Sequence, residues 1–236
     1  MALPYFYIES IDPGASSLVL NEEVSKHVVS VLRMKPGEKI HITNGKGYLQ
    51  TAALLSDHKK KTEVAILHSQ FTAAPEQKTC IAISLVKNAT RFEWFLEKAT
   101  ELGITEIIPL LCDRTEREHF RMDRMKNVLV SALVQSQQCW LPQLSEPVPL
   151  AAVLGTAQQH VKCIAHCTET EKKPLSELLQ KQYKSAIVLI GPEGDFTQLE
   201  IEAAFQHQFV PVSLGNTRLR TETAGITAAA LLKTFC

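Results

Sequence analysis

Apolar residues follow two different patterns along the chain, and the pattern changes near residue 72. Before that point, short alternating or β-branched runs lie between turn signals, at residues 16–21, 38–57 and 61–70. Asn44-Gly45 favours a hairpin turn inside the second run. Residues 21–34 form the one amphipathic pattern here and predict a short helix. So many short strands in a small span predict a small β-barrel domain over residues 1–72.

Beyond the polar segment 72–78, near-continuous apolar runs alternate with helical patterns. The apolar runs predict buried strands at 80–86, 104–111, 161–167, 185–191 and 209–215. The helical patterns lie at 91–103, 119–140, 174–183, 196–205 and 224–235, and Gly103 is placed to end the first of them. Strands of this kind, separated by helices, predict a parallel sheet covered on both faces. We therefore expect an α/β domain over residues 73–236.

Composition and charge narrow the class of protein. The formal net charge is +0 and 45% of residues are hydrophobic, which is typical of a soluble globular protein without a global preference for polyanions. No apolar run approaches the ~20 residues of a membrane span, and the first residues lack the pattern of a secretory leader. Six scattered cysteines read as reduced thiols, so we expect a cytoplasmic protein. Cys163, His166 and Cys167 lack a second matching pair, so no metal site is expected.

The first candidate for chemistry is the loop Gly191–Asp195, which follows a predicted buried strand. Thr197 and Glu200 have the spacing of a capping box, which places a helix start directly after the loop. Open α/β sheets bind ligands at such strand ends, and two glycines allow close backbone approach. The alternative is a purely structural turn between strand and helix.

The second candidate repeats this arrangement at residues 213–232. An apolar strand leads into a polar loop, residues 215–221, and then into an apolar helix. Two strand-loop-helix junctions within the last fifty or so residues could line one pocket between them. No phosphate-binding loop of the GxxxxGK[ST] type and no GxGxxG fingerprint is present, which argues against a nucleoside triphosphate or dinucleotide site.

Basic residues form two weaker candidates for nucleic-acid contact. Arg114 and Arg117 belong to the charged segment 113–126, where acidic residues nearly balance the basic ones. This segment fits a helix entry with surface ion pairs, although arginine also suits phosphate binding. His27, Arg33 and Lys35 give the N-terminal part only a weakly basic character. Charge alone leaves RNA binding open.

Several segments together resemble one known family. "LIGPEGDFTQLEI" and "SLGNTRLRTETAGITAA" resemble the paired C-terminal signature of the RsmE-type 16S rRNA (uridine-N3) methyltransferases of the SPOUT superfamily. "FLEKATELGITEIIPL" and "SALVQSQQCWLP" resemble internal segments of that family. "HVVSVLRMKPGEKIHITNGKG" resembles its N-terminal PUA-like barrel. The resemblance thus spans nearly the whole chain.

This resemblance implies a SPOUT-type parallel sheet with a C-terminal trefoil knot, a PUA-like RNA-binding barrel, and S-adenosylmethionine as methyl donor. It also implies a homodimer in the cytoplasm that methylates N3 of one uridine in 16S rRNA. The expected partner is this RNA within the small ribosomal subunit, and naked RNA stays open as the substrate. The residues it implies for the methyl donor are Leu189, Gly191, Pro192, Glu193, Gly194, Leu214, Gly215, Leu219, Arg220, Thr221, Thr223 and Ala224.

The same resemblance implies roles in catalysis and RNA contact. A cation near the uridine carbonyl oxygens would stabilise the N3 anion, and Arg220 or Arg114 is expected to supply it. Glu222 is expected to accept the proton or to orient Arg220, with Glu193 as the other candidate; a buried Arg-Glu pair could equally be structural. His27, Arg33, Lys35 and Arg117 are the expected RNA contacts.

The chain departs from the family pattern in places. Asp195 stands where the family has a second glycine, and Val134 and Gln138 replace a glutamate and an arginine. Two other functions stay open on the sequence: a non-catalytic RNA-binding assembly factor with the same fold, and a methyltransferase for another RNA. The apolar helix 224–235, rich in small residues, suits either a dimer interface or burial within one subunit.

Overall fold

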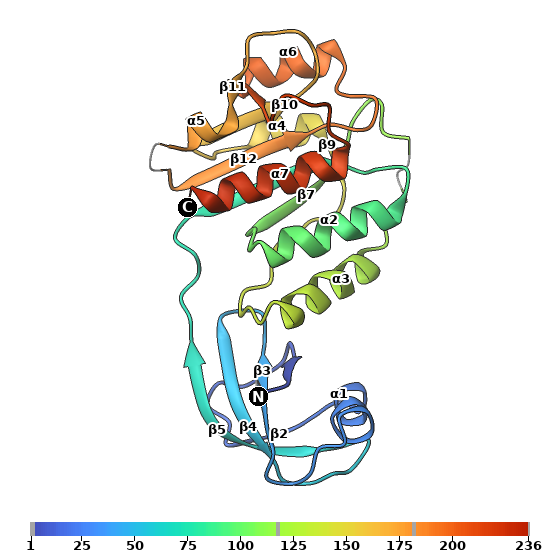
Figure 1. Ribbon diagram of the computed structural model, residues 1–236, viewed down its shortest axis with the longest axis vertical. Coiled ribbons are helices and arrows are strands. Elements are labelled where there is room, and N and C mark those ends of the chain that lie inside the picture. Colours follow the sequence, from blue (N-terminus) through green and yellow to red (C-terminus); the bar gives the residue numbers. More distant parts are fainter. Residues whose placement is uncertain (1–2, 117–118, 181–182, 236) are drawn as a thin grey trace. The chain divides into compact units, whose positions relative to one another are not determined.

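The computed structural model describes residues 3–116, 119–180 and 183–235 (Figure 1). Arg117, an expected RNA contact, lies outside these residues. The chain divides into two compact units, one made of residues 1–74 and 133–141 and the other of residues 75–132 and 142–236.

The first unit is built on a five-stranded sheet in the order β1-β3-β4-β5-β2. Its strands are β1 (Tyr5–Tyr7), β2 (Ser17–Val19), β3 (Lys39–Thr43), β4 (Tyr48–Leu54) and β5 (Glu63–Phe71). The β1–β3 pair is parallel and the others are antiparallel. The predicted hairpin is confirmed: Gly45 has φ +66° between β3 and β4, and Asn44 Oδ1 accepts from the Lys46 amide at 2.8 Å. Strand β1 was missed because its three residues give no periodicity.

The predicted helix at 21–34 is confirmed in part. Asn21 caps α1 (Glu22–Lys26) by accepting from the Val24 amide at 2.9 Å. The chain then continues as a one-turn π-helix over His27–Val31. It stops there because Arg33 adopts φ +57°, which no helix accommodates. Buried Val24 and Val28 pack into a core with the inward-facing residues of the sheet.

The segment 133–141, which the sequence assigned to the second domain, is part of the first unit. The Tyr5 hydroxyl donates to the Gln138 carbonyl oxygen at 2.9 Å, and the Trp140 indole donates to the Thr72 carbonyl oxygen at 2.9 Å. The Gly47 amide donates to the Cys139 carbonyl oxygen at 2.8 Å. A pattern of apolar residues along one helix carries no signal for such backbone contacts.

The second unit contains an eight-stranded sheet in which all pairings are parallel. Its order is β11-β13-β10-β12-β6-β7-β8, with β9 beside β7. The long strands confirm the five predicted ones: β6 (Lys78–Ser84), β7 (Glu106–Leu111), β10 (Val161–Ala165), β12 (Ser185–Ile190) and β13 (Val210–Ser213). The others, β8 (Gln143–Leu144), β9 (Val148–Pro149) and β11 (Lys173–Pro174), have two residues each and no detectable pattern.

Helices cover both faces of this sheet, as predicted (Figure 1). On one face α7 (Thr221–Thr234) packs against α2 (Ala89–Glu101), α5 (Leu175–Leu179), β6 and β12. On the other, α4 (Leu150–Thr156) and α6 (Gln198–Gln206) enclose a core with Ile164, Leu189 and Phe209. Helix α4 was not predicted, since its seven residues are too few for a clear helical period.

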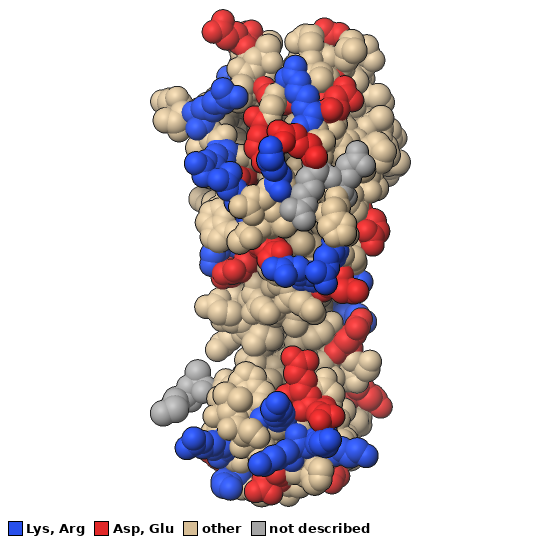
Figure 2. All heavy atoms as spheres, turned by 90° about the vertical axis from the view of Figure 1, so that its right-hand side faces the viewer, with Lys and Arg blue, Asp and Glu red and all other residues tan. Residues whose placement is uncertain are grey.

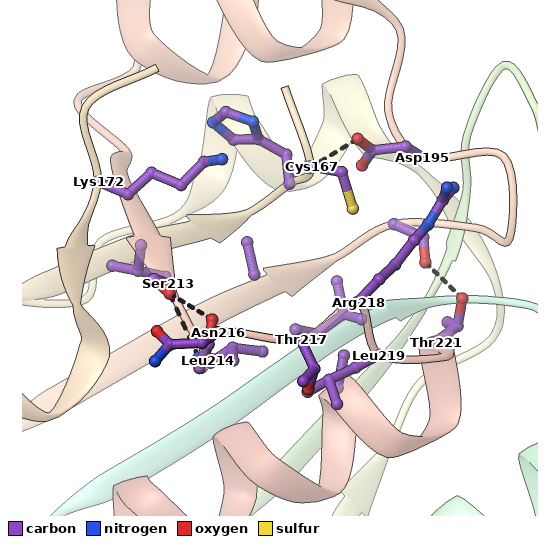
Figure 3. Close-up of a pocket in the computed structure, with 17 residues that line it drawn as sticks. Cys167, Lys172, Asp195, Ser213, Leu214, Asn216, Thr217, Arg218, Leu219 and Thr221 are labelled. Atoms are coloured by element: carbon purple, nitrogen blue, oxygen red, sulfur yellow. Dashed lines mark hydrogen bonds between the residues drawn. The ribbon is translucent and has the colours of Figure 1, made fainter. Parts of the chain in front are cut away.

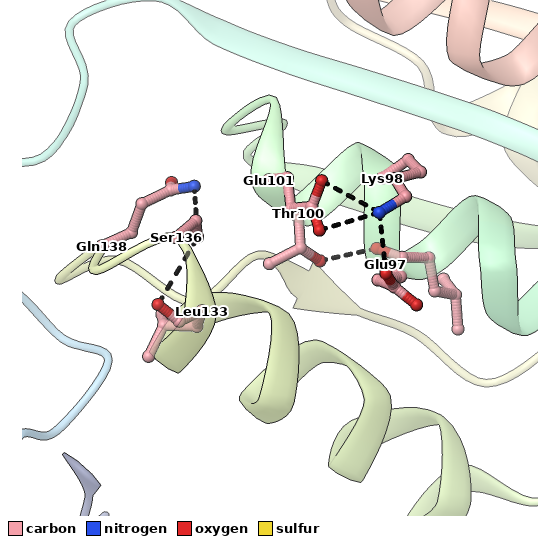
Figure 4. Close-up of polar contacts among 8 residues, drawn as sticks. Glu97, Lys98, Thr100, Glu101, Leu133, Ser136 and Gln138 are labelled. Carbon is pink, nitrogen blue, oxygen red and sulfur yellow. Dashed lines mark hydrogen bonds and ion pairs between the residues drawn. The ribbon is translucent and has the colours of Figure 1, made fainter. Parts of the chain in front are cut away.

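The helix ends show where sequence signals worked. The capping box at α6 is confirmed, with Thr197 and Glu200 making both reciprocal contacts. Gly103 ends α2 at φ +78°, also as predicted. Near that end, Lys98 Nζ contacts Glu97 at 2.7 Å and Glu101 at 3.0 Å (Figure 4). Helix α3 (Met122–Gln135) ends earlier than the predicted residue 140. Gln137 turns the chain at φ +55°, and the Gln138 amide donates to the Leu133 carbonyl oxygen at 3.1 Å.

Candidate functional site

A cavity of about 430 Å³ opens at the carboxyl ends of β10, β12 and β13, which are neighbours in the sheet (Figure 3). This is the edge of an α/β sheet at which ligands bind. The segments after these strands and the start of α7 form its walls. The lining residues are Ala165, His166, Cys167, Lys172, Ile190, Gly191, Asp195, Thr221, Ala224 and residues 212–219.

Gly191 begins the first loop and is held from two sides. A Cβ at this position would lie 3.0 Å from the ring of buried Phe196, so a side chain here would require this ring to shift. On the other side, the buried Thr221 hydroxyl donates to the Gly191 carbonyl oxygen at 3.0 Å (Figure 3). This bond joins the first residue of α7 to the end of β12. The two strand-loop-helix junctions predicted from sequence therefore do line one cavity.

Asp195 connects the first loop to the end of β10. Its Oδ2 accepts from the Cys167 amide at 2.8 Å, and its Oδ1 accepts from the Phe196 amide at 2.9 Å. Its backbone has φ +64°, a conformation that favours glycine and is tolerated by aspartate. The carboxylate therefore ties together two walls of the cavity.

The second loop contributes apolar walls and one long cationic side chain. Gly215 has φ +142°, and the Ser213 hydroxyl donates to its carbonyl oxygen at 2.9 Å. Leu214 and Leu219 line the cavity next to this turn. The Arg218 side chain extends toward the side on which Asp195 lies (Figure 3).

His166 is a buried polar residue of the lining, with 7% of its surface exposed. Neither ring nitrogen has a hydrogen-bond partner. Burial lowers the pKa of His166, the positive charge of Lys172 lowers it further, and the negative charge of Asp195 opposes the shift. The imidazole is therefore neutral near pH 7, with one nitrogen able to donate and the other able to accept.

The residues expected to bind the methyl donor are only partly brought together. Gly191, Leu214, Gly215, Leu219, Thr221 and Ala224 line the cavity. The others do not: Leu189 is in the core, Pro192 is buried within the first loop, Thr223 is half-buried, and Glu193, Gly194 and Arg220 are exposed.

Arg114 and Glu193 support the first loop from outside the cavity. The Arg114 guanidinium donates to the Gly194 carbonyl oxygen at 2.7 Å. Gly194 lies so close that a Cβ there would be 3.3 Å from Arg114 Cδ. Glu193 Oε1 accepts from the Lys87 amide at 3.0 Å. These contacts fix the outer edge of the loop and leave the exposed Arg114 side chain at the protein surface.

Glu222 is buried in the first turn of α7, where the helix dipole favours a carboxylate. Its Oε1 lies 3.7 Å from Arg91 Nε, and its Oε2 is buried without a hydrogen-bond partner. Its ion pair is thus with Arg91 of α2, while the Arg220 side chain is exposed at the N-cap of α7. Sequence reasoning had not considered Arg91.

The lining residues that were not candidates include His166, Lys172, Asp195 and Arg218. The available signal was position, because His166 lies near the end of the predicted strand 161–167 and Asp195 ends the loop that follows the predicted strand 185–191. Within the described ranges, no three His, Cys, Asp or Glu residues are grouped to hold a metal ion.

Three of the four basic residues expected to contact RNA lie on the surface of the first unit, and the fourth, Arg117, is outside the described residues. His27, Arg33 and Lys35 are exposed in and just after the π-helix, and Lys35 is 3.7 Å from Asp57. Within each unit, basic and acidic side chains are interspersed over the face shown in Figure 2. No described helix is long and apolar enough to span a membrane.

Family models match most of the chain. Residues 72–233 match the model described as an RNA methyltransferase domain, and residues 20–67 match the model described as an RNA methyltransferase PUA domain.

Similar proteins are named alike. The Ribosomal RNA small subunit methyltransferase E of Buchnera aphidicola subsp. Schizaphis graminum is 26% identical over 98% of this chain and 96% of the relative. The protein of the same name from Bacillus subtilis is 26% identical over 95% of this chain and 92% of the relative. A crystal structure of the Neisseria gonorrhoeae protein of that name, bound to S-adenosyl methionine, matches with TM-score 0.87 and 30% identity, over 99% of this chain and 98% of the other. A Legionella pneumophila methyltransferase in complex with the same cofactor matches with TM-score 0.88 and 30% identity, over 99% of this chain and 98% of the other.

Proposed function

Because the chain belongs to the RNA methyltransferase family with an N-terminal PUA domain, we propose that it methylates small-subunit (16S) ribosomal RNA with S-adenosylmethionine, at N3 of a specific uridine. The observation that carries the proposal is the cavity at the ends of β10, β12 and β13, in a chain similar to two methyltransferases crystallised with this methyl donor. The reaction takes place in the cytoplasm, where ribosomal subunits are assembled.

The residues present fit the methyl donor. The cavity joins apolar walls from Leu214 and Leu219 to a polar end at His166 and Asp195, which matches a molecule with a purine and an amino-acid part. His166 has two buried ring nitrogens available to a ligand. When bound there, S-adenosylmethionine supplies an electrophilic methyl group on a positively charged sulfur.

The chain's own residues position the uridine and manage its N3 proton. Transfer in line requires N3 to face the methyl group, so much of the rate comes from positioning. Arg220, exposed directly before α7, is the residue that reaches the uridine carbonyl oxygens and stabilises negative charge developing on them. Arg114 holds the loop around Gly194 through its carbonyl oxygen, which supports a positioning role in place of contact with the base.

Glu222 accepts the N3 proton, either directly or through a water molecule. Its Oε2 is buried without a partner in the same turn of α7 that borders the cavity at Thr221. Arg91 lies 3.7 Å from the other oxygen and keeps the carboxylate in place. Glu193 is less suited to this role because it is exposed and bonded to the Lys87 amide.

Basic residues capture the RNA, and three of them are exposed on the first unit. His27, Arg33 and Lys35 contact the RNA from the PUA domain, since they are exposed close together in sequence. Arg117, which belongs to the charged segment 113–126 and lies outside the described residues, is the further phosphate contact.

The protein acts as a homodimer with a knotted C-terminal segment. Helix α7 buries Gly225, Ala228, Ala229 and Leu232 within its own subunit, while Ile226, Thr227, Ala230 and Leu231 are half-buried and form the face for a partner copy. The trefoil knot is supported by the path after β13. Strand β13 lies two positions from β12 in the sheet, with β10 between them. After β13 the chain returns past β10, so that the first residue of α7, Thr221, lies beside Gly191 at the end of β12.

The test is methylation of purified small subunits and naked 16S rRNA by the chain, followed by mapping of the modified nucleotide by mass spectrometry. A single N3-methyluridine is the expected product. Arg220→Ala and Glu222→Gln should lower the rate with S-adenosylmethionine binding retained. Binding of RNA without binding of the methyl donor in calorimetry would instead favour an assembly factor, and another modified base or RNA would overturn the stated specificity.

A further inference from the structure

Both ring nitrogens of His166 are buried, and neither has a hydrogen-bond partner. The centroid of its ring lies 6.1 Å from the centroid of the Phe205 ring. Only 7% of the residue's surface is exposed, so solvent has little access to it. Leaving a buried donor or acceptor unpaired costs stability, and native proteins seldom tolerate it without a reason. Because His166 also lines the cavity, a ligand in the cavity can supply the missing hydrogen bonds.

Opposite charges flank this imidazole. Lys172 and Asp195 both line the cavity, and their charges act on His166 in opposite directions. Among the ion pairs of the described residues, none joins Lys172 to Asp195. Lys172 Nζ instead donates to the Thr168 carbonyl oxygen at 2.6 Å. A cation and an anion that face one cavity without contacting each other complement a zwitterion placed between them.

Asp195 also determines where His166 lies. Its carboxylate accepts from the amide of Cys167, the residue next to His166, at 2.8 Å, and from the Phe196 amide at 2.9 Å. A glycine would adopt φ +64° with less strain but would make neither contact. The strain at Asp195 is therefore compensated by a bond that holds the His166–Cys167 segment against the first loop.

We propose that His166, between Lys172 and Asp195, binds the α-amino-acid part of the methyl donor, and that Asp195 is a positioning residue that holds His166 in place for this contact. The inference rests on the proposed function and assigns the polar end of its cavity. The neutral imidazole accepts from the ligand's ammonium group or donates to its carboxylate, and the adenosyl part occupies the apolar end at Leu214 and Leu219.

The experiment compares two ligands by calorimetry: S-adenosylhomocysteine, which carries the amino acid, and 5′-methylthioadenosine, which lacks it. His166→Phe keeps an aromatic ring but removes both nitrogens, and it should weaken S-adenosylhomocysteine binding about tenfold, the order expected for one lost hydrogen bond. Binding of 5′-methylthioadenosine should change less than twofold, within about the error of such a measurement. The thermal midpoint should stay the same or rise, because the unpartnered buried atoms are gone.

Asp195→Gly and the double variant test positioning. Asp195→Gly should weaken S-adenosylhomocysteine binding by a similar factor, and the double variant should be no weaker than His166→Phe alone, because both changes remove one contact. Gln208→Gly is the matched control: Gln208 also has φ +66°, so glycine relieves the same strain outside the cavity, and binding should be unchanged.

The outcomes separate the two proposals. Equal losses for both ligands, or additive effects in the double variant, would overturn the inference and leave the methyltransferase proposal standing. The same holds if His166→Phe binds like the wild-type chain. Failure of the wild-type chain to bind S-adenosylhomocysteine at all would overturn the proposed function, together with this inference.

Discussion

Gly225, in the middle of α7, should be intolerant of even one added methyl group. A Cβ there would lie 2.7 and 2.8 Å from two ring atoms of Phe95 and 2.8 Å from Ile83 Cδ1. Both residues are fully buried, so neither ring nor methyl has free space to move into. Gly225→Ala therefore forces α7 away from α2 and β6, or displaces the Phe95 ring.

The size of the effect follows from two opposing terms. Alanine is favoured over glycine in a helix interior by about 1 kcal/mol. Overpacking a filled core costs about 1–3 kcal/mol, and contacts below 3 Å to a rigid ring place Gly225 near the upper end. The net destabilisation is about 2 kcal/mol. For a chain of this size that corresponds to a thermal midpoint roughly 4–8 °C lower.

Gly155 provides the matched control. It lies in α4, is exposed, and a Cβ there would meet nothing within 4 Å. Gly155→Ala should therefore gain only the helix preference, up to about 1 kcal/mol, and raise the midpoint. Both variants and the wild-type chain are compared by circular dichroism during thermal and urea unfolding. A midpoint for Gly225→Ala equal to or above that of the wild type would refute the packing argument.

Three further predictions concern the site. Thr221→Val keeps the side-chain shape but removes the donor to the Gly191 carbonyl oxygen, so stability should fall by about 1–3 kcal/mol in urea unfolding, with weaker methyl-donor binding in calorimetry. Glu222→Gln should slow methyl transfer by about 10²–10⁴-fold at saturating methyl donor, as expected for loss of a general base; an unchanged single-turnover rate would exclude Glu222 from proton transfer. Burial lowers the pKa of His166, so the unfolded chain binds a proton more readily than the folded one. The contribution of the neutral His166 to the free energy of unfolding is then fully present above the ordinary histidine pKa of about 6.5. This contribution is lost as pH falls below that value. Urea unfolding at pH 7.5 and 5.5 should show a larger loss for the wild type than for His166→Phe.

Much of the architecture could be predicted because its signals are local. Near-continuous apolar runs identified the five long strands of the parallel sheet, and Thr197 with Glu200 identified the start of α6. The two glycine-containing loops could be placed at one pocket, since carboxyl ends of parallel strands meet at the same edge. Strands β1 and β11, of three and two residues, were missed because no periodicity develops over so short a length.

The sequence by itself therefore determined the class of fold, the two loops that line the cavity and the resemblance to RNA methyltransferases, because each depends on residues close together in the chain. Only the tertiary structure decided which side chains meet. It brought His166, Lys172 and Asp195 to one cavity, placed Glu222 beside Arg91, and turned Leu189 into the core. Asp195 is far in sequence from His166 and Lys172, as Glu222 is from Arg91, and their meeting depends on strand order and helix packing, which no local pattern encodes.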